Sequence, residues 1–93
     1  MNYFNSIVQS LTITDLKILG ILHDQNIDVK FKAVKKKKLK EESLLSESNF
    51  RKSLYRLDAM QFIELVTGEK DHRVFISDIG KEALRISLSE EAI

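Results

Sequence analysis

Short polar and basic side chains line one side of a helix that the sequence pattern predicts over residues 46–60. Ser48, Asn49 and Lys52 present hydroxyl, amide and ammonium groups on the side opposite the apolar residues of this segment. An amide can form two hydrogen bonds with adenine, and an ammonium group can reach the hydrogen-bond acceptors of guanine. These residue types at this spacing predict hydrogen bonding to the base edges of duplex DNA.

Positive charge is concentrated around this segment. The stretch from Asp28 to Arg56 contains ten basic and four acidic residues, so it carries +6 and leaves −5 for the rest of a chain whose net charge is +1. Tyr55 and Arg56 are expected to meet phosphate, although Tyr55 could equally pack on the neighbouring hairpin. A run of lysines would attract phosphate through counterion release, or it is simply a solvated helix face. This run comprises Lys35, Lys36, Lys37 and Lys38.

A second group of basic residues surrounds a polar turn that contains glycine. Lys70, His72 and Arg73 could follow the DNA backbone or enter the adjacent minor groove. Arg73 could instead pair with Asp71 or Glu69 across the turn, and such a surface ion pair would contribute little stability. The turn is therefore a second candidate point of contact with DNA.

The helix that carries the first group has a clear beginning and a clear buried side. Ser46 is a good N-cap residue, and it is also included among the candidate DNA contacts. Phe50, Leu54 and Leu57 follow at intervals that place them on one stripe of a helix. This stripe would pack on the protein core and turn the polar side outward.

Other patterns predict the elements that hold this helix. Thr12, with Asp15 three residues later, forms a relaxed capping box at the start of an apolar helix that is buried on more than one side. Ser77 can cap the last helix. The expected elements are a short helix within residues 3–11, a helix over 13–25, a strand or the start of a helix over 29–32, a helix over 33–42, strands over 62–66 and 73–76, and a helix over 78–88.

The order of these elements is that of a winged helix-turn-helix, and two runs of residues resemble MarR and PadR regulators. Residues 45–57 resemble the turn and recognition helix of those regulators, and residues 73–80 resemble their second wing strand leading into a serine cap and a glycine. Lys40 and Leu44 stand where a small residue and a glycine are usual, so a wider turn is expected. The resemblance implies a mainly α fold with a small β-hairpin, comprising a three-helix core, a wing and a C-terminal helix.

The length of 93 residues suits a single domain, with residues 1–11 as an N-terminal extension and 12–88 as the core. The leading interpretation is sequence-specific binding of double-stranded DNA by a transcription regulator. A homodimer is expected, because one such module makes few base contacts and paired half-sites raise specificity. The alternative is a protein-interaction module in a replication, transcription or mobile-element assembly. The modest net charge and the bulky Phe62 and Tyr55 near the wing favour that alternative.

Several classes of function are not expected. The absence of cysteine excludes disulfides and thiolate metal sites, and His23 and His72 do not have metal-ligand spacing. The scattered carboxylates and the lack of a nucleophile motif or a phosphate-binding glycine loop argue against an enzyme. No cofactor, metal or small-molecule ligand is predicted. No apolar run is long enough for a membrane span, no signal peptide is recognisable, and a cytoplasmic location is expected.

Overall fold

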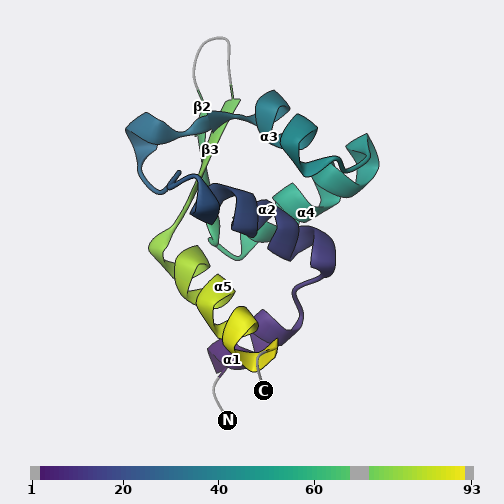
Figure 1. Cartoon of the computed structure of the whole chain (residues 1–93), viewed down its shortest axis with the longest axis vertical. Coiled ribbons are helices and arrows are strands. Elements are labelled where there is room, and N and C mark those ends of the chain that lie inside the picture. Colours follow the sequence, from purple (N-terminus) through teal and green to yellow (C-terminus); the bar gives the residue numbers. More distant parts are fainter. Residues whose placement is uncertain (1–2, 68–71, 92–93) are drawn as a thin grey trace.

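A computed structural model describes the backbone of residues 3–67 and 72–91 (Figure 1). The wing strands lie at one end of the molecule, and the first and last helices lie together at the other. The elements, in order, are α1 (Tyr3–Gln9), α2 (Ile13–Asp24), the 3-10 turn η1 (Lys30–Lys32), β1 (Val34–Lys35), α3 (Lys36–Ser43), α4 (Glu47–Ala59), β2 (Ile63–Thr67), β3 (His72–Ile76) and α5 (Asp78–Glu91).

The sheet has three antiparallel strands in the order β1-β3-β2, so β3 is central. The predicted hairpin is confirmed, with Ile63 opposite Ile76. The third strand was not predicted, and it corrects the expected start of the second core helix. Val34 pairs with Val74, so residues 33–35 are not helical and α3 begins only at Lys36. In the stretch 29–32, which the sequence left open, Val29 is extended and Lys30–Lys32 form the 3-10 turn η1.

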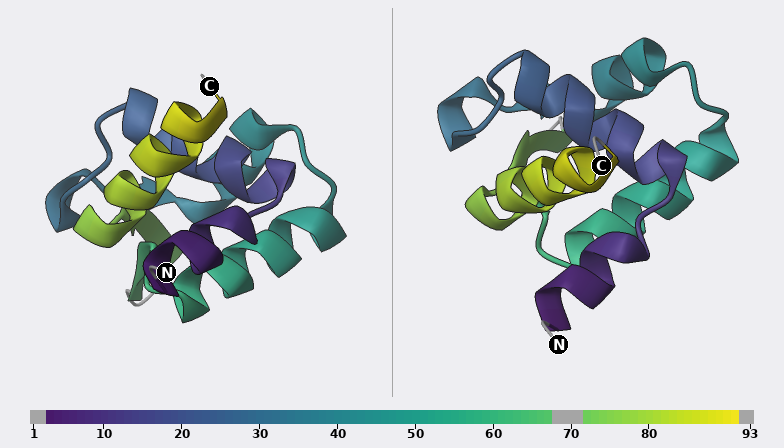
Figure 2. Two further views of the ribbon diagram at one scale, coloured as in Figure 1. Left: turned by 90° about the horizontal axis from the view of Figure 1, so that it is seen from below. Right: turned by 60° about the horizontal axis from the view of Figure 1, so that its bottom comes forward.

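The core lies between α2, the sheet and the inner sides of the surrounding helices. Ile18, Leu19 and Leu22 of α2 are fully buried, and the helix contacts α3, α4, α5 and β3, as expected for a helix covered on more than one side. Helix α1 closes the core at the end far from the wing, where the Phe4 ring meets the Phe62 ring edge-on at a centroid distance of 6.0 Å. Figure 2 shows α1 and α5 next to each other, and the two helices are in contact.

The turn between α3 and α4 bends at an unusual residue. Leu44 adopts a left-handed conformation with φ of 60°, and its side chain is 85% exposed. Glycine is common at this position of a helix C-terminus because it has no Cβ to clash. Ser43 supports the bend, since its hydroxyl donates to the Lys40 carbonyl at 2.7 Å and accepts from the Leu45 amide at 3.3 Å. The chain therefore makes the helix-turn-helix bend without glycine.

Candidate nucleic-acid interface

Helix α4 presents its polar side to solvent, as the sequence predicts. The Ser46 hydroxyl caps the helix by accepting a hydrogen bond from the Asn49 amide at 3.2 Å. The apolar stripe is buried against the core. Four candidate DNA contacts are exposed on the other side, namely Ser48, Asn49, Lys52 and Tyr55. Tyr55 is 64% exposed, so its ring is available to a ligand.

Polar contacts between α2 and α4, together called the seam, fix the rotation of α4 about its own axis. The hydroxyls of Thr14 and Ser53 are 2.8 Å apart. The Arg56 guanidinium donates to both carboxylate oxygens of the fully buried Asp15, at 3.1 and 2.7 Å. It also donates to the Thr12 hydroxyl at 3.2 Å. Paired donors on a carboxylate set orientation as well as distance, so this seam determines which side of α4 faces outward.

The same seam governs the ionisation of Asp15. Burial alone would raise the pKa of this carboxyl group, because it disfavours the charged form. Hydrogen bonds from the Arg56 side chain, the Thr12 amide and the Ser53 hydroxyl outweigh burial and lower the pKa of Asp15 below its ordinary value of 3.8. Conversely, the carboxylate raises the pKa of Arg56. Both groups are charged at neutral pH.

Arg56 therefore has a partner that the sequence analysis did not foresee. The sequence pattern predicts a contact of Arg56 with a DNA phosphate, whereas its guanidinium lies on Asp15 and remains only partly exposed. The physical reason is the burial of Asp15, since a buried carboxylate without a cation would be costly. The pair positions α4, and contact of the partly exposed Arg56 with a DNA phosphate stays a prediction.

The predicted lysine run divides between two elements. Lys35 lies in β1, whereas Lys36, Lys37 and Lys38 form the first turn of α3, so the run is not one helix face. Lys35, Lys37 and Lys38 are exposed, and Lys36 is half-buried.

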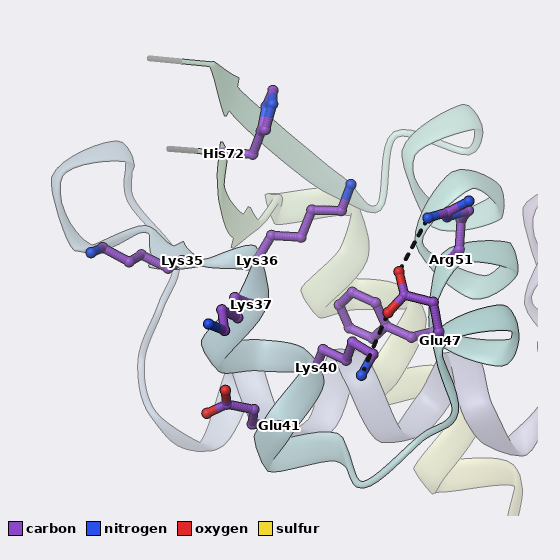
Figure 3. A pocket seen from close by; sticks show the side chains of 9 residues that line it. Lys35, Lys36, Lys37, Lys40, Glu41, Glu47, Arg51 and His72 are labelled. Carbon is purple, nitrogen blue, oxygen red and sulfur yellow. Dashed lines mark hydrogen bonds and ion pairs between the residues drawn. The ribbon is translucent and has the colours of Figure 1, made fainter. Parts of the chain in front are cut away.

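A cleft of about 610 Å³ lies between α3, the start of α4 and β3 (Figure 3). Figure 3 shows Lys36 extending into the opening between β3 and α4. The cleft is lined by Lys35, Lys36, Lys37, Lys40, Glu41, Glu47, Phe50, Arg51 and His72. Five of these nine residues are lysine or arginine and two are glutamate, which makes the cleft attractive to anions.

Five of the lining residues were not predicted from the sequence as part of the site, namely Lys40, Glu41, Glu47, Phe50 and Arg51. Glu47 pairs with Arg51 at 3.1 Å within α4, and it also pairs with Lys40 of α3 at 3.5 Å. The Glu47–Arg51 pair has the i, i+4 spacing that favours ion pairs on a helix, so this part carried a signal in the sequence. The contact with Lys40 depends on how α3 and α4 cross.

The wing contributes two of its three predicted contacts to the described part of the molecule. His72 and Arg73 are exposed on β3. Arg73 donates to the Ala33 carbonyl at 3.4 Å, which connects the wing to the segment before β1. Lys70 lies outside the described residues, as do Asp71 and Glu69, the predicted partners of Arg73.

Residues 3–67 and 72–91 contain neither a metal-ligand cluster nor a membrane-spanning helix. Across that part of the chain, no three histidine or acidic side chains gather closely enough to hold a metal ion. None of the helices described there combines the length and apolar character needed to cross a membrane.

Comparison with known proteins gives close and distant matches. The DNA-binding protein TubR of Priestia megaterium is 39% identical over 84 residues, which are 90% of this chain and 83% of that protein. The solved structure of TubR from Bacillus megaterium pBM400 matches with a TM-score of 0.89 and 38% identity, covering 95% of this chain and 98% of that one. The MarR family transcription regulator SP03579 matches with a TM-score of 0.72 and 15% identity, covering 89% of this chain and 53% of that one. No model of a protein family matches the chain.

These matches confirm the predicted winged helix-turn-helix fold. The likeness to SP03579 concerns the fold alone, and it agrees with the resemblance to MarR regulators seen in the recognition-helix and wing residues. The likeness to TubR is one of sequence as well as of fold. The chain belongs to the TubR family of winged helix DNA-binding proteins.

Proposed function

We propose that this chain is a cytoplasmic regulator that binds specific sequences of duplex DNA by placing α4 in the major groove. The observation that carries this proposal is the outer side of α4, where Ser48, Asn49 and Lys52 are exposed while the opposite side is anchored to α2. A recognition helix needs this combination, because its base-reading groups must be short, polar and held in a fixed orientation. The name of the related TubR, a DNA-binding protein, supports the same function.

The groups around α4 suit contacts with the DNA backbone. Lys37 and Lys38 are exposed in the first turn of α3, and Lys37 lines the cleft together with residues from the start of α4. His72 lies on the wing and lines the cleft across from α4, and Arg73 is exposed next to it in β3. Phosphate contacts from two sides would fix the register of the recognition helix without reading sequence themselves.

The polar character of this surface also favours DNA over the alternative of a protein partner. A protein-binding surface is expected to have an apolar centre with aromatic anchors. Tyr55 is the exposed aromatic residue on α4, and its neighbours on that side are polar or basic. The surface therefore resembles a nucleic-acid interface more than a protein interface.

Two single substitutions separate base reading from backbone attraction. Asn49→Ala is expected to weaken binding to duplexes selected from a random pool by about 5- to 100-fold, with relaxed selectivity at one base position. Lys37→Ala is expected to weaken binding to all duplexes alike, and to reduce the slope of log affinity against log salt by about one. Fluorescence anisotropy at several salt concentrations measures both effects.

Lys17→Ala is the matched control for these variants. Lys17 is exposed on α2, and it lies two residues after Asp15, so it points away from the side of α2 that contacts α4. This control is expected to bind like the original chain. Failure of the original chain to bind any selected duplex at low salt would refute the proposed function. Equal losses in Lys17→Ala and Lys37→Ala would refute the proposed position of the interface.

We also propose that the chain acts as a homodimer that joins through α1 and α5. These helices are in contact at the end opposite the wing, and Leu88 of α5 is 54% exposed there (Figures 1 and 2). Pairing at this end would leave both copies of α4 free to contact DNA. Sedimentation equilibrium is expected to show a dimer that Leu88→Glu dissociates. A monomer at all micromolar concentrations would contradict this proposal.

A further inference from the structure

Glu47 places a carboxylate inside the basic cleft. It lies 3.5 Å from the Lys40 ammonium and 3.1 Å from the Arg51 guanidinium, so one acidic group links a cation of α3 to a cation of α4. Figure 3 shows the Glu47 side chain between these two partners. A phosphate group could bind between the same two cations, because its negative oxygens accept hydrogen bonds from lysine and arginine.

The two ion pairs are weakly held. The side chain of Glu47, which both pairs share, is 66% exposed, that of Arg51 is 60% exposed and that of Lys40 is 33% exposed. Exposed ion pairs contribute little free energy, because water screens the charges and both side chains lose freedom when they pair. An incoming polyanion can therefore displace this carboxylate. While the carboxylate stays in place, it repels phosphate and satisfies two donors that phosphate would use.

We propose that Glu47 occupies a backbone-phosphate subsite in the free protein, and that a DNA phosphate displaces it to bind Lys40 and Arg51. This inference rests on the proposed DNA binding. Glu47 then acts as a built-in competitor that lowers affinity for any duplex, so that stable binding depends more strongly on base contacts made by α4. Lys40 and Arg51 join the interface, although the sequence pattern of the recognition helix did not single them out.

The salt dependence of binding provides a specific signature. The displaced carboxylate stays near the bound phosphate, so it cancels one of the positive charges that the subsite offers to DNA and lowers the number of released counterions by about one. A neutral glutamine cancels none. Glu47→Gln should therefore increase the slope of log affinity against log salt by about 0.9, besides raising the affinity itself.

The experiment compares Glu47→Gln with Glu41→Gln on a random-sequence 30-base-pair duplex. Glu41 lines the same cleft, and Glu41→Gln removes the same charge. Among the described residues, however, Glu41 forms no ion pair with Lys40 or Arg51. We expect Glu47→Gln to tighten binding by about three- to tenfold at 100 mM salt, and Glu41→Gln to change it by less than about twofold. In an Arg51→Gln background, the gain from Glu47→Gln should shrink to less than about twofold, because one of the released cations is missing.

The outcomes are distinct from those that test DNA binding itself. Equal gains in Glu47→Gln and Glu41→Gln would show that only net charge matters, and would overturn the inference. Weaker binding by Glu47→Gln, with thermal unfolding unchanged, would also overturn it. If the original chain and all variants fail to bind the duplex, while remaining folded, the proposed function fails rather than the role of Glu47.

Discussion

Replacing Arg56 with methionine is expected to lower the free energy of unfolding by about 3 kcal/mol at pH 7, because it leaves the buried carboxylate of Asp15 without a cation. Methionine keeps most of the apolar stem, so lost packing contributes little. We place the effect at the low end of the range for buried pairs, because the guanidinium is partly exposed. Urea unfolding followed by circular dichroism measures the change.

Two controls separate the burial of Asp15 from general effects on α4. Arg51→Met makes the same substitution on the same helix, but its pair with Glu47 is exposed, so we expect a loss below about 1 kcal/mol. Adding Asp15→Asn to Arg56→Met should recover about 1 kcal/mol or more, because the unpaired buried charge is gone. Equal losses in Arg51→Met and Arg56→Met would contradict this account of the seam.

The pair also predicts a direction for the dependence of stability on pH. The pKa of Asp15 is lowered by folding, so the stabilisation from this group is fully present above its ordinary value of 3.8. It is lost as the pH falls below 3.8 and passes through the lowered pKa of the folded state. In Arg56→Met, burial without the guanidinium would raise the pKa of Asp15, so protonation should begin at higher pH. The stability profiles of the two proteins should therefore converge in acid.

The sequence predicted the parts of the fold that local patterns determine. Thr12 and Asp15 form the capping box that their spacing indicated, and Ser46 caps α4 at the predicted residue. The buried and exposed sides of α4 follow from the helical period of Phe50 and Leu54. Each of these features depends on residues a few positions apart, so its signal lies in a short stretch of sequence.

The unforeseen features depend on residues far apart in the chain. Asp15 and Arg56 are 41 positions apart, so no local sequence pattern indicates that they form a pair. Strand β1 contains only two residues, and it forms because Val34 meets Val74 on β3. The cleft needs α3, α4 and β3 together. The charge run thus indicated the region of the proposed interface, while packing decided which cations face outward and which are held by the protein.

Replacing Gly80 with alanine is expected to cost about 3 kcal/mol or more of folding free energy, although alanine is the better helix former. A Cβ at Gly80 would lie 1.9 Å from the Phe62 carbonyl oxygen and 2.8 Å from the Phe62 carbonyl carbon. Both atoms belong to the backbone, so no side-chain rotation can relieve the clash. The Phe62 carbonyl also accepts a hydrogen bond from the Ser77 amide at 3.0 Å, which ties it to the start of α5. The first turn of α5 would have to move away from the strand β2.

Gly20 provides the matched control for this substitution. It also lies within a helix, but a Cβ added there meets no other atom within 4 Å. Gly20→Ala should therefore raise the free energy of unfolding by about 0.5–1 kcal/mol, through helix propensity alone. Opposite signs for the same change in two helices would show why glycine is required at position 80, in the first turn of α5. The reason would be the close approach of the Phe62 backbone rather than the conformational freedom of glycine. A neutral or stabilising Gly80→Ala would mean that α5 can shift on the sheet at little cost, contrary to the packing described.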